Sequence, residues 1–247
     1  MRRSKSETAP AKSKKSEKTA SKRSPKAAVA VKPKAVTVDL YRYEREARDL
    51  GHELIAGVDE AGRGPLAGPV VAACVILPAD FVAGEINDSK QLTEAKRETA
   101  YDRICREAIA VGVGVIHHEK IDEINILQAT YVAMRSAIAT LEPDIRPSIV
   151  LVDGNPVPAL PCSHVRNIID GDALSISIAA ASIIAKVTRD RFMTQMHRHY
   201  PHYGFASHKG YSAPIHLEAL RTHGPCPIHR RSFARIAAFY NQTVLDL

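Results

Sequence analysis

Carboxylates beside glycines are the residues of this chain with the clearest capacity for chemistry. Asp59 and Glu60 end an apolar run that begins at Leu54, and the segment Gly62-Arg63-Gly64 follows at once. Carboxylate oxygens are the ligands that hard divalent cations prefer. Backbone without Cβ atoms lets a ligand approach closely. This arrangement therefore predicts a binding or catalytic site rather than a core.

Two further acidic residues, Asp153 and Asp172, also follow apolar runs. Functional groups of α/β proteins collect at strand ends, and four converging carboxylates would repel one another without cations. Oxygen-only ligands favour Mg²⁺ or Mn²⁺ over Zn²⁺, and two such ions can support phosphodiester cleavage. Isolated aspartates at strand ends are more often turn formers or helix caps, so spacing alone leaves both interpretations open.

The adjacency of Asp59 and Glu60 raises a geometric problem. Neighbouring residues of a strand point to opposite faces of the sheet. The two side chains therefore cannot both point inward unless the strand end is irregular. If the strand end is regular, we expect Glu60 to contribute partly through its backbone carbonyl.

The elements that must position these residues are strands first, followed by alternating helices and strands. Apolar runs predict strands over 54–59, 70–77, 111–116, 149–153 and 165–169, and helical patterns span 93–108, 122–141, 175–199 and 213–222. Thr93 is the expected N-cap of the first helix, and Asp122 and Asn125 are expected to cap the second. This order predicts an α/β fold with a mixed sheet.

Charge divides the chain into two parts. Residues 1–36 contain 12 Lys or Arg and 2 Asp or Glu, which leaves 22 basic and 25 acidic residues for 37–247. The first part is rich in Lys, Ser, Ala and Pro and predicts a disordered basic tail. The second part predicts one folded domain. A basic tail can attract phosphates without sequence preference, or it can be a dispensable solubility extension, and both remain open.

Composition also bears on the compartment. The charged tail is not followed by the apolar core of a secretory signal, and no apolar run reaches transmembrane length. The four cysteines are far apart and form no CxxC pair. We therefore expect reduced thiols, a cytoplasmic location and no membrane association.

A set of motifs resembles the ribonuclease HII family across roughly residues 52–235. In order along the chain they are Gly57-Val58-Asp59-Glu60-Ala61-Gly62-Arg63-Gly64-Pro65, Asn87-Asp88-Ser89-Lys90, Asp122-Glu123-Ile124-Asn125-Ile126-Leu127, Val152-Asp153-Gly154-Asn155, Ala180-Ala181-Ser182-Ile183-Ile184-Ala185-Lys186-Val187-Thr188-Arg189-Asp190, Tyr203-Gly204-Phe205, His208-Lys209-Gly210-Tyr211 and His229-Arg230-Arg231-Ser232-Phe233. The resemblance implies a ribonuclease H-like mixed sheet flanked by helices, with a helical C-terminal portion. Residues 37–247 would then be the catalytic domain.

The resemblance also implies an activity. Members of this family hydrolyse the RNA strand of RNA–DNA hybrids and cut 5′ of single ribonucleotides in duplex DNA, which leaves 3′-hydroxyl and 5′-phosphate ends. The expected partners are therefore RNA–DNA hybrids and ribonucleotide-containing duplex DNA. A monomer is expected, and the sequence identifies no protein partner.

By motif position, the resemblance implies Asp59, Glu60, Asp153 and Asp172 as catalytic carboxylates that bind Mn²⁺ or Mg²⁺. Asp172 is chosen over Asp170 because of its Gly171-Asp172 pair and its distance to the following helix. Asp170 adds a charge beside the site.

The substrate contacts implied by the resemblance are of three kinds. Gly62, Arg63 and Gly64 would sense the ribonucleotide through their backbone, because the minor groove displays the 2′-hydroxyl. Tyr211 would stack on the sugar 3′ of the ribonucleotide. Phosphate contacts are expected from Ser89, Lys90 and Lys209.

Several alternatives remain at this point. Lys186 and Arg189 could offset carboxylate charge, touch phosphate or form an ordinary basic helix face. Residues 229–231 could touch DNA or pack around Phe233. A non-catalytic hybrid-binding protein is the competing function, although all four carboxylates are present. Ribonuclease HIII is the nearer rival, but it carries a folded N-terminal domain and a glutamate at the fourth acidic position.

Overall fold

The structure is a computed structural model that describes residues 38–84, 86 and 92–242. The predicted basic tail, residues 1–36, lies outside the described residues, as do the predicted phosphate contacts Ser89 and Lys90. Among the described helices, none combines the length and the apolar character of a membrane span.

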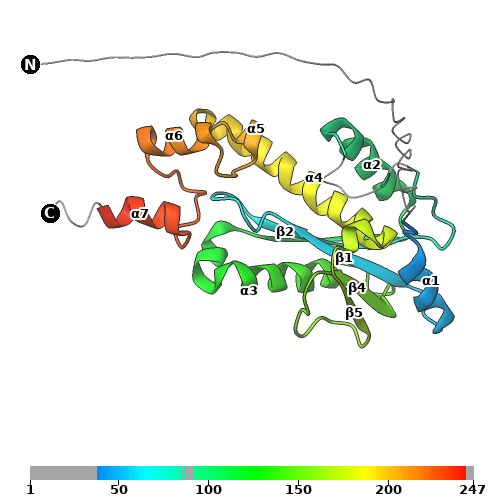
Figure 1. Ribbon diagram of the computed structural model, residues 1–247. Helices are drawn as coiled ribbons and strands as arrows, with labels where there is room; N and C mark the ends of the chain where they lie inside the picture. The colour runs from blue at the N-terminus through cyan, green and yellow to red at the C-terminus, as the bar shows by residue number, and fades with distance from the viewer. Residues whose placement is uncertain (1–37, 85, 87–91, 243–247) are drawn as a thin grey trace, which may run out of the picture. The chain divides into compact units, whose positions relative to one another are not determined.

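A five-stranded sheet organises the described chain in the order β3-β2-β1-β4-β5 (Figure 1). The strands are β1 (Ile55–Ala61), β2 (Val70–Ile76), β3 (Ala110–Ile116), β4 (Ile149–Asp153) and β5 (Val165–Ile168). The pairs β1–β2 and β2–β3 are antiparallel, whereas β1–β4 and β4–β5 are parallel. The predicted mixed sheet is therefore confirmed.

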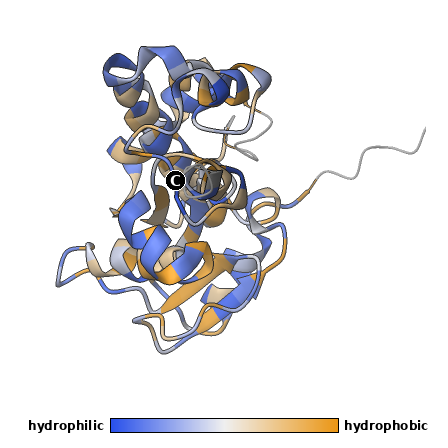
Figure 2. Cartoon of the chain, turned by 90° about the vertical axis from the view of Figure 1, so that its left-hand side faces the viewer, coloured by the Kyte–Doolittle hydropathy of each residue, from blue (hydrophilic) through white to orange (hydrophobic). Residues whose placement is uncertain are grey.

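Helices cover both faces of this sheet, and a helical portion follows it. Their bounds are α1 (Arg42–Asp49), α2 (Glu94–Glu107), α3 (His118–Ala139), α4 (Ile176–His199), α5 (Phe205–His208), α6 (Pro214–His223) and α7 (Ala234–Gln242), with short 3₁₀ turns η1 (Gly171–Ala173) and η2 (Pro201–Tyr203). Figure 2 shows the hydrophobic residues gathered along the strands and on parts of the helices. The predicted α/β class is confirmed.

The alternation of side chains along β1 assigns its residues to two cores. Ala56 and Val58 pack in the core shared with α3. Gly57 instead faces α4, because a Cβ built on it would lie 2.0 Å from the Ser177 carbonyl carbon. The bare Gly57 therefore lets the start of α4 lie directly on the sheet.

The N-terminus of α4 is fixed by side chains from two elements. Ser175 is its N-cap and accepts a hydrogen bond from the Ile178 N–H at 3.3 Å. Glu44 of α1 is buried and accepts from the Ser175 hydroxyl and the Ser177 N–H. A carboxylate at this position satisfies free N–H groups and complements the positive end of the helix. These contacts place α4 over β1.

Helix α3 differs from its sequence prediction. It begins at His118 rather than near residue 122, and Asn125 interrupts it with a φ of 67°. Asn125 Oδ1 accepts from the N–H groups of Leu127 and Gln128, so its predicted capping role is confirmed. The capping role predicted for Asp122 is wrong, because its carboxylate accepts hydrogen bonds from residues 231 and 232 near α7.

Candidate functional site

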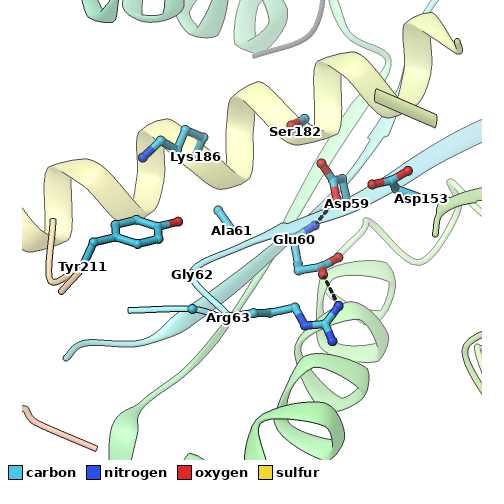
Figure 3. Close-up of a pocket in the computed structure, with 10 residues that line it drawn as sticks. Asp59, Glu60, Ala61, Gly62, Arg63, Asp153, Ser182, Lys186 and Tyr211 are labelled. Carbon is cyan, nitrogen blue, oxygen red and sulfur yellow. Dashed lines mark hydrogen bonds and ion pairs between the residues drawn. The ribbon is translucent and has the colours of Figure 1, made fainter. Parts of the chain in front are cut away.

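The C-terminal ends of β1 and β4 bring Asp59 and Asp153 to one edge of the sheet. The parallel register pairs Val58 with Val152, so the next residue on each strand is an aspartate. Asp59 lies on the same strand face as Gly57, and both aspartates point towards the α4 side (Figure 3). Strand β1 continues to Ala61 through its antiparallel partner β2, which makes it longer than predicted.

Asp59 is the more buried of these two aspartates, with 5% of its surface exposed. Its Oδ1 accepts from the Glu60 N–H at 2.7 Å, and it is hydrogen-bonded to Ser182 of α4. Burial raises the pKa of Asp59 well above its usual range, and the negative charges of Glu60 and Asp153 raise it further. A cation at this position would stabilise the ionised form of Asp59.

Glu60 points to the other side of the strand, as the alternation of strand residues predicts (Figure 3). Its Oε1 accepts from Arg63 Nη1 at 3.2 Å. Burial raises the pKa of Glu60, although the charge of Arg63 partly offsets this effect. About half of the Arg63 side chain is exposed, whereas Glu60 is mostly buried, so the guanidinium is the accessible partner of this ion pair.

The fourth predicted carboxylate, Asp172, lies in η1 and is buried, with 3% of its surface exposed. Its neighbour Gly171 donates its N–H to Asp153 Oδ1 at 2.6 Å, which links η1 to the end of β4. Asp170, by contrast, is exposed and has a φ of 55°. The structure thus buries the aspartate that sequence reasoning selected and exposes its neighbour.

A cavity of about 290 Å³ joins three of the four carboxylates to the glycine-containing loop. Asp172 does not line it. The lining residues are Asp59, Glu60, Ala61, Gly62, Arg63, Gly64, Asp153, Ser182, Lys186 and Tyr211. Lys186 and Tyr211 lie at the end opposite Asp153 (Figure 3). Ser182 carries no local sequence signal of a role in the site, because a serine in an alanine-rich helix is typical of close helix packing.

The donor set of this cavity fits a hard divalent cation. All candidate ligands are carboxylates, which hard divalent cations prefer, and the pKa of Asp59 is raised first by burial and then by the negative charges of Glu60 and Asp153. In the described part of the chain, however, no three His, Cys, Asp or Glu side chains lie close enough together to hold a metal. Glu60 points to the other side of the strand and accepts from Arg63, whereas Asp59 and Asp153 lie side by side on the α4 side (Figure 3).

The predicted substrate residues differ in their positions. Tyr211 is 46% exposed, and its ring faces Gly64, where a Cβ would lie 3.6 Å from its Cε1. Lys209 is buried, and its ammonium lies near Thr194 at 3.3 Å and Glu94 at 3.6 Å, outside the cavity. Its contact with phosphate stays a prediction.

The alternatives left open for the basic residues are now resolved in part. Lys186 forms an ion pair with Asp190 at 2.7 Å and also lines the cavity. Arg189 is buried and bonds to backbone carbonyls, so it is not part of a basic surface. His229 and Arg230 are buried as well, which favours packing over DNA contact for these two residues.

Comparisons with known proteins agree with this architecture. Residues 56–236 match the family model described as Ribonuclease HII. The Ribonuclease HII of Citrifermentans bemidjiense is 56% identical over 81% of this chain and 85% of its own length. That of Acetivibrio thermocellus is 54% identical over 78% of this chain and 74% of its own. The crystal structure of the ribonuclease H2 from Pyrococcus horikoshii OT3 superposes with a TM-score of 0.63 at 29% identity. The match covers 76% of this chain and 97% of the other.

The sheet, the helices and these structural neighbours together define a ribonuclease H-like nuclease. The sequence matches identify the family within this class, because they are long and more than half of the aligned residues are identical. The chain belongs to the ribonuclease HII family, which cleaves the RNA of RNA–DNA hybrids. The predicted family and fold are therefore confirmed.

Proposed function

We propose that this protein cuts duplex DNA on the 5′ side of single embedded ribonucleotides, as well as the RNA strand of hybrids. The products would carry 3′-hydroxyl and 5′-phosphate ends. The observation that carries this proposal is the shared cavity, because Asp59, Glu60 and Asp153, the Gly62-Arg63-Gly64 loop and Tyr211 all line it. A cleavage centre and a recognition element are thus contiguous.

The carboxylates are proposed to hold Mn²⁺ or Mg²⁺ next to the phosphate that is cut, with Asp172 completing the set from η1. When bound, such ions activate a water molecule and stabilise the leaving oxygen. Asp59 and Asp153 point to the same side of the sheet and would present their oxygens together. Glu60 would become available when the half-exposed Arg63 leaves it for a substrate phosphate, which a guanidinium binds well, and a cation would then replace Arg63 as the partner of this mostly buried carboxylate.

Recognition is proposed to occur at the opposite end of the cavity. The backbone of residues 62–64 would hold the 2′-hydroxyl of the ribonucleotide, and the exposed ring of Tyr211 would stack on the next sugar. Lys186 lines the cavity on the same side as Tyr211 and would attract the phosphate electrostatically. Phosphate contacts from Ser89, Lys90 and Lys209 remain part of the proposal.

The test uses a labelled DNA duplex with one ribonucleotide, a matched all-DNA duplex and an RNA–DNA hybrid, each with Mn²⁺ or Mg²⁺. We expect one cut 5′ of the ribonucleotide, a product that a DNA polymerase can extend, and no cut in the all-DNA duplex. A cut 3′ of the ribonucleotide with a cyclic phosphate end would contradict the proposal, because it would mean that the 2′-hydroxyl is the nucleophile. Binding without cleavage of either ribonucleotide substrate would favour a hybrid-binding protein.

A further inference from the structure

Two buried arginines lie beneath the Gly62-Arg63-Gly64 loop and take no direct part in the proposed chemistry. Arg189 of α4 is 1% exposed, and Arg230, which precedes α7, is 0% exposed. Neither guanidinium forms an ion pair with a carboxylate of the described residues. Burial lowers the pKa of Arg189 to about 10 and that of Arg230 to about 9, so both stay charged at neutral pH. Buried charges without a counterion must be compensated by hydrogen bonds.

Arg230 finds this compensation in the carbonyls of the loop. Its Nη2 donates to Gly62 O at 2.6 Å and Nη1 donates to Arg63 O at 2.9 Å. Nε donates to Gly68 O at 2.9 Å, and Nη2 also reaches Pro69 O at 3.1 Å. One side chain thus binds both ends of the turn between β1 and β2.

Arg189 ties the same turn to the segment that carries Tyr211. It donates to Ala67 O at 3.1 Å, Pro69 O at 2.9 Å and Lys209 O at 3.0 Å. It does not bond to Gly62 O or Arg63 O in the described structure. The two arginines therefore bind different carbonyls of the turn, and only Arg230 contacts those of Gly62 and Arg63.

The Arg230 contacts determine which way two peptide planes face. In a trans peptide the C=O and the following N–H point in opposite directions. Because Gly62 O and Arg63 O are directed into the protein at Arg230, the N–H groups of Arg63 and Gly64 are directed away from it. Residues 62–64 line the cavity, whereas Arg230 does not. No described residue accepts a hydrogen bond from either N–H.

Resting on the function proposed above, we propose that Arg230 is the positioning residue for ribonucleotide recognition, because it holds the Arg63 and Gly64 N–H groups towards the cavity. There they can donate to a 2′-oxygen. The role is specific to an arginine, since only its planar fork of donors can reach the carbonyls at both ends of the turn.

Packing at Gly62 supports this account. Gly62 has a φ of 99°, and a Cβ there would lie 2.1 Å from Arg189 Nε and 2.4 Å from its Cδ. The loop backbone therefore rests directly on a guanidinium. This contact leaves the loop little freedom to turn its carbonyls outward.

The test compares Arg230→Lys with Arg231→Lys, a neighbouring and exposed control. Cleavage rates are measured on a duplex with one ribonucleotide and on the same duplex with a 2′-fluoro nucleotide, which accepts hydrogen bonds poorly. We expect Arg230→Lys to reduce the preference for the ribonucleotide by about tenfold, the effect of one hydrogen bond, while Arg231→Lys keeps it. A merely structural role would slow both substrates equally and overturn the proposal. A wild-type enzyme that does not cut the ribonucleotide duplex would instead refute the proposed function.

A second measurement uses the wild-type protein and so does not depend on a variant folding. Amide hydrogen exchange, followed by NMR, reports on the N–H groups of Arg63 and Gly64. We expect both to exchange rapidly in the free protein and to become protected by a ribonucleotide duplex in Ca²⁺, with less protection by the 2′-fluoro duplex. Protection of both amides in the free protein would show that they face inward and would overturn the proposal.

Discussion

The contact between Gly57 and α4 sets how closely this helix lies on β1, and Gly57→Ala tests it. The new Cβ would lie 2.0 Å from the Ser177 carbonyl carbon and 2.3 Å from the Ile178 nitrogen, whereas real Cβ contacts stay above 3.0 Å. Strand and helix must therefore separate by about 1 Å. Overpacking of this kind costs about 1–3 kcal/mol. In a domain of this size, each kcal/mol lowers the melting temperature by about 2–4 °C.

The same displacement should reduce activity. Helix α4 carries Ser182 and Lys186 over the cavity, and a misplacement of ~1 Å can cost a hundredfold in rate. We would measure melting by circular dichroism and cleavage at a temperature where the variant is folded. Gly51→Ala is the control, because nothing lies within 4 Å of its Cβ and only its φ of 90° is strained. A Gly57→Ala variant with wild-type melting and wild-type cleavage would refute the reasoning.

Three further predictions follow from buried charge and from the tail. Asp59→Asn should have a higher melting temperature than the wild type in the absence of metal, because the raised pKa of Asp59 makes its ionised form costly at neutral pH. Mn²⁺ should raise the melting temperature of the wild type but not that of the variant. A metal-free variant that melts at a lower temperature than the wild type would contradict this. Burial lowers the pKa of His216 and His229 to about 4. Between pH 6.5 and 4 the unfolded chain therefore binds more protons than the folded chain, which favours unfolding. The free energy of unfolding, measured with urea, should fall as the pH is lowered from 6.5 towards 4, and it should fall less steeply in His216→Asn. Equal slopes of this free energy against pH in the wild type and the variant would argue against this. Deleting residues 1–36 should flatten the dependence of log affinity on log salt for duplex DNA, and an unchanged slope would mean that the tail does not contact nucleic acid.

Much of the architecture follows from local patterns. The apolar runs that end in Asp59 and Asp153 predict two strands with carboxylates at their ends, and the structure pairs these strands in parallel, as is typical of strands buried on both faces. Thr93 caps α2 as expected, by accepting from the Lys96 N–H. The bounds of β1 were less predictable, since its extension to Ala61 depends on pairing with β2 rather than on its own sequence.

The residues that support the site were harder to find. Arg189 and Arg230 are typical surface residues by composition, and their burial depends on carbonyls more than a hundred residues away in the sequence. The position of Asp122 likewise depends on a turn near α7. Asn125 carries a local signal, because asparagine tolerates a positive φ and caps helices, but the sequence does not indicate that the helix begins as early as His118.

The most direct test of the carboxylate site is single-turnover cleavage of a duplex containing one ribonucleotide by the wild type and by Asp153→Asn, with Mn²⁺. Binding of the same duplex is measured in parallel. We predict a single cut 5′ of the ribonucleotide by the wild type. In the variant, binding should be retained, and cleavage should fall by more than the roughly 100-fold that the loss of an outer-shell partner costs. Cleavage by Asp153→Asn at the wild-type rate would contradict the assignment of the catalytic centre to the ends of β1 and β4.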